Sequence, residues 1–249
     1  MPEHFIWLLV AALVVGLAKG GLSSAGSLAV PFLALFMNPV AAAALLLPVF
    51  LITDWFAVWL YRRDYSGRNI AILLPAILAG IAIATVIVPY TPEALLLAAT
   101  GGVGLWYCLR SWIGNSAAAP PRHADIGRGV FWGIITGITT FITHSGAPPS
   151  QAYLLPQKLP RMVFAGTMAI TFAISNAAKI PGYYALGYFE DMHWSLIATL
   201  SAVGIAGTGL GRQIVMRLTD RTYVQVIQAL LFILSIVLFW KAFTLITAA

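Results

Sequence analysis

The stretch THSGAPPS, Thr143–Ser150, places polar, glycine and proline residues between two strongly apolar segments. A backbone that leaves the helical conformation inside a bilayer has unpaired N–H and C=O groups, which is costly unless they line a cavity or bind a ligand. The stretch KGGLSSAGS, Lys19–Ser27, interrupts another apolar region near the start of the chain. We therefore predict two breaks in membrane helices, and these breaks mark the expected binding site.

The composition indicates the class of protein. Of the 249 residues, 60% are hydrophobic and 9% are charged, and the mean hydropathy is +0.90. Such values exclude a soluble domain and predict an all-α integral membrane protein with one domain over residues 1–249. Six segments are long enough to cross about 30 Å of hydrocarbon. They are residues 40–61, 70–88, 94–112, 163–180, 194–211 and 223–243.

Two further apolar regions, residues 5–36 and 130–155, are too long for one crossing. Each is broken midway into limbs of roughly 10 to 14 residues, a length that suggests re-entrant helices. The two regions resemble each other at a shift of about 121 residues, which places Gly16 on Gly137. We therefore predict that the chain is duplicated.

The predicted repeats are residues 1–113 and 128–249, joined by a Pro/Ala-rich linker at 114–127. Each repeat contains one broken helical hairpin and three transmembrane helices. If the hairpin enters and leaves on one face, the number of crossings is odd and the two repeats are inverted. Inverted repeats with broken helices are typical of secondary transporters.

In each hairpin the second limb begins at the break. Its N-terminus then points to the middle of the membrane, where free N–H groups and a partial positive charge attract an anion. Hydroxyl groups at the breaks can cap these ends or donate to an oxyanion, and Gly146 is expected to allow close backbone approach and a positive φ. The candidate substrate-binding residues are Lys19, Gly20, Gly21, Ser23, Ser24, Gly26, Thr143, His144, Ser145, Gly146, Asn176 and Lys179. The alternative is two ordinary turns, with Gly16/Gly20 and Gly133/Gly137 serving only as helix-packing faces.

Ionisable residues inside membrane segments are costly and are therefore functional candidates. Asp54, which corresponds roughly to Asn176 under the repeat shift, is a candidate for proton coupling, as is His144. Alternatively Asp54 forms a buried pair with Lys19, and His144 is a packing residue. Lys179 lies one helical turn after Asn176, so both can meet an anion, unless Lys179 extends to the membrane interface.

Two long runs carry a resemblance to a known family. They are THSGAPPSQAYLLPQKLPRMVFAGTMAITFAISNAAKIPGYYALGYF at 143–189 and GLAKGGLSSAGSLAVPFLAL at 16–35. Together they resemble the sulfite exporter TauE/SafE family of membrane transporters, and the likeness extends over nearly the whole chain. The first break departs from the glycine-rich tip common in that family, because Ser23, Ser24 and Ser27 stand among its glycines. The resemblance implies export of sulfite or of a small organosulfonate such as sulfoacetate, whereas composition and spacing imply only a small anion.

We therefore predict a secondary transporter that spans the cell inner membrane several times and exports a small sulfur-containing anion. The expected partners are the anionic substrate and membrane lipid, with a homodimer as an option and no nucleic acid. No cofactor is expected, and no metal, because none of the histidines lies at metal-ligand spacing from another. A proton- or ion-coupled importer of the same fold is the alternative. An intramembrane enzyme is a remote one, since HExxH and GxSxG motifs are absent from the sequence.

Loop charge predicts the orientation. Loops that carry several Lys or Arg residues face the cytoplasm, and both termini then lie outside. Single cysteines introduced into a background without Cys108 should therefore be labelled from outside near Glu190 and from inside near Ser66 and Ala124. Labelling of positions 66 and 124 from opposite sides would contradict the inverted-repeat arrangement.

Overall fold

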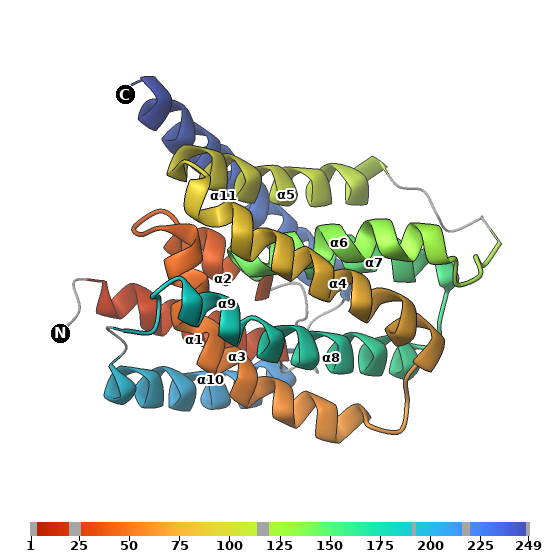
Figure 1. The fold of residues 1–249 in the computed structure, drawn as a ribbon. Helices are drawn as coiled ribbons and strands as arrows, with labels where there is room; N and C mark the ends of the chain where they lie inside the picture. The colour runs from red at the N-terminus through yellow and green to blue at the C-terminus, as the bar shows by residue number, and fades with distance from the viewer. Residues whose placement is uncertain (1–3, 20–25, 114–119, 191–192, 216–219, 248–249) are drawn as a thin grey trace.

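The computed structural model describes residues 4–19, 26–113, 120–190, 193–215 and 220–247. The described residues form helices joined by short connections, as predicted (Figure 1). The helices are α1 (Phe5–Lys19), α2 (Gly26–Leu33), α3 (Pro39–Tyr61), α4 (Gly67–Ile87), α5 (Glu93–Ile113), α6 (Ile126–Thr143), α7 (Ala147–Leu154), α8 (Arg161–Ala178), α9 (Ile180–Ala185), α10 (Trp194–Val215) and α11 (Asp220–Thr247). Single 3-10 turns follow α4 and α7 at Val88–Tyr90 and Leu155–Gln157.

Each of the six segments predicted to cross the membrane corresponds to one helix, namely α3, α4, α5, α8, α10 or α11. Within the described residues, five stretches are long and apolar enough to span: Pro39–Trp59, Gly67–Tyr90, Ile126–Thr143, Met162–Ala185 and Trp194–Gly211. The helices α5 and α11 are not among these stretches, although both correspond to predicted segments, and Leu231–Thr247 of α11 is a shorter apolar helix. The protein is a multi-pass membrane protein.

The second predicted break is present and separates α6 from α7. The first predicted break falls at residues 20–25, outside the described part of the chain, between the end of α1 and the start of α2. We name the pair α1 and α2 hairpin 1, and the pair α6 and α7 hairpin 2. The predicted limb length of 10 to 14 residues is wrong, because the first limbs have 15 and 18 residues and the second limbs have 8 each. The helix α6 begins earlier than predicted because the Asp125 carboxylate caps it, accepting from the Arg128 N–H at 2.8 Å. The helix α7 is short because Pro156 follows it in a 3-10 turn.

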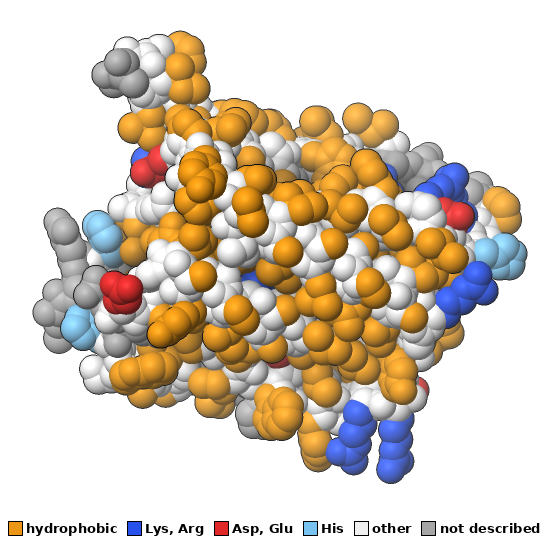
Figure 2. Space-filling model, viewed as in Figure 1, with side chains coloured by type: hydrophobic (Ala, Val, Ile, Leu, Met, Phe, Trp, Pro, Cys, Tyr) orange, Lys and Arg blue, Asp and Glu red, His pale blue; other side chains and the backbone are white. Residues whose placement is uncertain are grey.

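The two hairpins come from opposite ends of the molecule and meet near its centre (Figure 1). Hairpin 1 starts at the end where the N-terminus lies, and hairpin 2 starts at the other end, beside the connections that follow α3, α5 and α7. Most of the visible Lys and Arg side chains gather at that second end (Figure 2). The exposed Lys and Arg residues described in those connections and the adjoining helix starts are Arg62, Arg63, Arg68, Arg122, Arg128 and Lys158. This charge distribution agrees with the predicted orientation.

Helix pairing is reciprocal between the two predicted repeats. The long limb α1 packs against α10 of the other repeat, and the long limb α6 packs against α4. The helix α3 packs against α8, and α5 packs against α11. Exchanging the repeats leaves this set of pairs unchanged, as duplication requires. The inverted duplication itself stays a prediction.

Glycines bring the long limbs into backbone contact with their partners. A Cβ added to Gly16 would lie 2.0 Å from the carbonyl oxygen of Gly204 in α10, and one added to Gly137 would lie 2.2 Å from that of Ile77 in α4. At Gly133 an added Cβ would lie 2.6 Å from the Cβ of Ala76. Gly16, Gly133 and Gly137 are therefore helix-packing residues, in agreement with the alternative reading of these glycines.

These contacts predict a difference between two glycine substitutions. Gly137→Ala should lower the free energy of unfolding by about 1–3 kcal/mol, because α4 and α6 must separate to admit the methyl group. The control is Gly209→Ala in α10, where an added Cβ meets nothing within 4 Å. Removing a helix glycine there should leave stability unchanged or raise it by up to about 1 kcal/mol. Thermal unfolding in detergent tests this, and equal midpoints for the two variants would contradict it.

Candidate functional site

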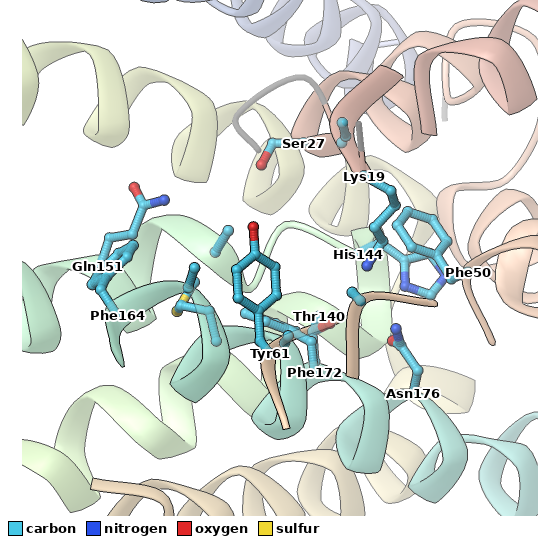
Figure 3. Close-up of a pocket in the computed structure, with 17 residues that line it drawn as sticks. Lys19, Ser27, Phe50, Tyr61, Thr140, His144, Gln151, Phe164, Phe172 and Asn176 are labelled. Atoms are coloured by element: carbon cyan, nitrogen blue, oxygen red, sulfur yellow. The ribbon is translucent and has the colours of Figure 1, made fainter. Parts of the chain in front are cut away.

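A cavity of about 270 Å³ lies between the ends of α1 and α6, the starts of α2 and α7, and the facing sides of α3 and α8 (Figure 3). We name it the central cavity. Gly26 and Ala147, the first residues of α2 and α7, both line it, so both short helices begin at the cavity wall. Their N-termini therefore contribute partial positive charge there, as the two breaks predicted.

The walls of the central cavity are mainly apolar. On α8, Phe164, Met168, Phe172 and Asn176 follow one another at intervals of four residues and so share one helix face. Phe50 and Tyr61 contribute from α3. The other polar side chains at the wall are Lys19, Ser27, Thr140, His144 and Gln151. The cavity therefore combines aromatic walls with a small number of polar groups, which is typical of small-molecule sites.

A buried carboxylate lies beside the cavity at the centre of the protein. The Asp54 side chain is 2% exposed and forms an ion pair with Lys19 Nζ. Its second oxygen accepts a hydrogen bond from Asn176 Nδ2. The pairing of Asp54 with Lys19, which the sequence offered as an alternative to proton coupling, is present. Lys19 ends α1, where the helix dipole also favours a cation.

A second polar cluster lies behind this pair. Lys179 Nζ donates to the carbonyl oxygen of Thr140 at 3.0 Å and contacts Nδ1 of His144 at 2.6 Å. Nε2 of His144 lies 2.8 Å from the carbonyl oxygen of Ala43, which can only accept. The hydrogen-bond network thus assigns the proton to Nε2 and makes Nδ1 the acceptor for Lys179.

The contacts of this cluster exclude one alternative for Lys179 and bear on the predicted substrate contacts of Lys179 and His144. Lys179 is fully buried, so extension of its side chain to the membrane interface is wrong. It is not among the described residues that line the cavity, because His144 stands at the wall. The His144 ring packs against Phe50 with ring centroids 4.3 Å apart, and both ring nitrogens have partners. Direct contact of Lys179 or His144 with substrate stays a prediction.

The tip of hairpin 2 differs from the prediction in one respect. Gly146 has a φ of −77°, and the left-handed residue is His144, with a φ of 53°. His144 takes this conformation because it ends α6, where its N–H donates to the Thr140 carbonyl oxygen. The requirement for glycine at 146 is spatial, since an added Cβ would lie 2.8 Å from the Cβ of Thr140 and 2.9 Å from Cε1 of Phe172.

The hydroxyl groups of this tip face the backbone. Thr143 Oγ1 donates to the Thr139 carbonyl oxygen at 3.0 Å and accepts from the Ser145 N–H at 3.3 Å. Ser145 Oγ lies 3.4 Å from the Thr143 carbonyl oxygen. These contacts lie within the end of α6 and the turn, and α7 has no side-chain cap, so the predicted capping of α7 by Thr143 or Ser145 is wrong. Donation to an anion stays a prediction. In hairpin 1, four candidate residues lie outside the described part of the chain: Gly20, Gly21, Ser23 and Ser24.

Several residues of the cavity wall were not predicted from the sequence. Counting back from Asn176 in steps of four would have found the α8 face, and one step back from His144 would have found Thr140. Tyr61, two turns after Asp54, could have been found in the same way. Gln151 gave no such signal, because the direction of α7 could not be deduced from spacing.

The central cavity lies on the Lys/Arg side of the buried charges. Tyr61 at its wall directly precedes Arg62, and Phe164 lies in the first turn of α8. On the opposite side, Phe141 and Tyr183 are fully buried with ring centroids 4.6 Å apart, and Tyr183 Oη donates to the Phe141 carbonyl oxygen. Tyr183 lies one helical turn after Lys179, because its N–H donates to the Lys179 carbonyl oxygen at 3.0 Å.

The fold and the cavity define a class of protein: a multi-pass membrane protein in which described residues of hairpin 1 and hairpin 2 line an internal polar site, an architecture typical of transporters. The family model described as sulfite exporter TauE/SafE matches residues 8–238. The chain therefore belongs to the TauE/SafE family of membrane transporters, as its sequence indicated. Comparisons with curated proteins and with solved structures gave no match.

The buried ion pair predicts non-additive substitutions. Lys19→Met should lower the free energy of unfolding by about 3–5 kcal/mol, because it leaves the Asp54 carboxylate buried without its cation. Asp54→Leu should cost less, since the Lys19 side chain is 19% exposed and can reach water. The double variant should be more stable than the sum of the single losses implies. Unfolding of the three variants in detergent measures the coupling, and strictly additive losses would show that the pair makes no energetic contribution.

Proposed function

We propose that this protein is a secondary transporter that exports a small sulfur-containing anion across the cytoplasmic membrane. The candidate substrates are sulfite and small organosulfonates such as sulfoacetate. The observation that carries the proposal is the central cavity, where Lys19 and the N-termini of α2 and α7 converge inside the membrane. Family membership supports the same class of substrate.

The chemistry of the cavity suits such a substrate. An ammonium group, helix N-termini and hydroxyl groups such as that of Thr140 stabilise an oxyanion. The aromatic wall from Phe50, Phe164 and Phe172 can contact the carbon chain of an organosulfonate. The volume of about 270 Å³ is below the usual range for drug-sized ligands and leaves room for a small anion with several waters.

The position of the cavity supports loading from the Lys/Arg end. If that end is cytoplasmic, the substrate enters from the cytoplasm while the contact between Phe141 and Tyr183 closes the outside. An inside-negative membrane potential assists an outgoing anion by about 2.3 kcal/mol per charge per 100 mV. Both considerations favour export.

Proton-coupled import is the weaker alternative in this geometry. Asp54 is held by Lys19 and Asn176, and both ring nitrogens of His144 have partners. Neither group is therefore free to exchange a proton with the central cavity without rearrangement. The coupling roles of Asp54 and His144 stay predictions.

Flux into proteoliposomes tests the function and the role of hairpin 2 together. Wild-type protein should transport sulfite or sulfoacetate above the rate of protein-free liposomes. Gly146→Val should abolish this flux, because its side chain displaces Thr140 and Phe172 at the cavity wall. The controls Thr143→Ala and Ser145→Ala each remove one hydroxyl and should cost about 0.5–1.5 kcal/mol at most.

Equal amounts of folded protein must be compared. Normal flux through Gly146→Val would show that the tip of hairpin 2 is only a turn. Absence of flux for every sulfur anion in the wild-type protein would overturn the proposed function.

A further inference from the structure

The side-chain amide of Asn176 has one hydrogen-bonding group with a protein partner and one without a partner among the described residues. Nδ2 donates to the Asp54 carboxylate. Oδ1 is buried and has no hydrogen-bond partner among the described residues. Asn176 is only 2% exposed, and it lines the central cavity. A buried carbonyl oxygen without a donor is unfavourable, and most such groups in proteins are paired.

The orientation of this amide is fixed by its neighbour. Rotating the amide by half a turn would place Oδ1 against the Asp54 carboxylate, where two acceptors would face each other. Asp54 cannot turn away, because Lys19 holds its other oxygen. Because Asn176 lines the central cavity, a ligand held there is the available source of a donor for Oδ1. In Figure 3, Asn176 projects from α8 at the same end of the cavity as Lys19 and His144.

The positive charge available at this end is small. Lys19 is the one Lys or Arg among the described residues that line the cavity, and it already neutralises Asp54. The ammonium of Lys179 is engaged by Thr140 and His144, behind the wall. A substrate with two negative charges would therefore be poorly compensated in this buried site.

We propose that Asn176 Oδ1 selects monoanions that carry a hydrogen-bond donor. Hydrogensulfite is then preferred over the sulfite dianion, and a hydroxyalkanesulfonate is preferred over an alkanesulfonate of the same size. Sulfoacetate, which has two charges and no donor at neutral pH, binds more weakly than either favoured species. The inference rests on the proposed function and makes Asn176 the residue that determines specificity within it.

Two ligands of equal charge and similar size test the selection. In 2-hydroxyethanesulfonate a hydroxyl group occupies the place of the terminal methyl group of propane-1-sulfonate. Titration calorimetry with the purified full chain in detergent should give about tenfold tighter binding of 2-hydroxyethanesulfonate, because propane-1-sulfonate leaves Oδ1 unpaired. Sulfoacetate should bind at least tenfold more weakly than 2-hydroxyethanesulfonate.

A matched pair of variants then assigns the selection to one residue. Asn176→Leu removes the acceptor at similar volume and should reduce the affinity ratio of the first two ligands to about one. Gln151→Leu is the control, since Gln151 lines the opposite end of the cavity (Figure 3), and it should keep the wild-type ratio.

Three results would overturn the inference: equal binding of 2-hydroxyethanesulfonate and propane-1-sulfonate by the wild-type protein, sulfoacetate binding as tight as that of 2-hydroxyethanesulfonate, or an unchanged ratio in Asn176→Leu. The wild-type comparison needs no substitution, so it decides the question even if Asn176→Leu does not fold. Equal binding together with sulfite flux would remove only the selection. Absence of both binding and flux for all sulfur anions would remove the proposed function as well.

Discussion

The structure depends on one buried carboxylate. Asp54 joins three helices, since it belongs to α3, pairs with Lys19 at the end of α1 and accepts from Asn176 on α8. A carboxylate at this depth is tolerable only with a cation and a further donor, so these three helices are held in one relative position. That position brings the end of α1 opposite the aromatic face of α8, and the central cavity lies between them. The charge pair therefore holds the cavity in shape and also supplies its cation.

The ends of the first limbs, α6 and α1, are stabilised by different contacts. At hairpin 2, the left-handed His144 ends α6, Thr143 caps the turn, and Gly146 admits the side chains of Thr140 and Phe172. At hairpin 1, the first limb ends in Lys19, whose ammonium is directed at Asp54 on another helix. The tip of hairpin 2 is thus stabilised by its own hydrogen bonds, whereas the described end of α1 is held by a long-range ion pair.

Hydrophobic length and the interrupted segments were enough to predict the long helices and the break between α6 and α7, because membrane spans have a minimum length and unpaired backbone groups are excluded from lipid. The pairing of Asp54 with Lys19 was one of the alternatives, since a buried charge needs a partner. The limb lengths could not be predicted, because they depend on the Asp125 cap and on glycine contacts with distant helices. The partners of Lys179 could not be predicted either. These partners are Thr140 in α6 and His144 at its end, which lie 39 and 35 residues away in the chain. Only the packed structure brings them to Lys179.

The glycine contacts constrain how such a protein can move. Gly16 of the first repeat touches the backbone of α10 in the second, and Gly137 of the second touches the backbone of α4 in the first. The backbones of the two predicted repeats also meet where Gly166 of α8 contacts Asp64 beyond α3, and where Gly101 of α5 contacts Ser235 of α11. A rocking motion of one predicted repeat against the other would have to separate all of these contacts together. We therefore expect the moving units of a transport cycle to be composite, each built from helices of both predicted repeats.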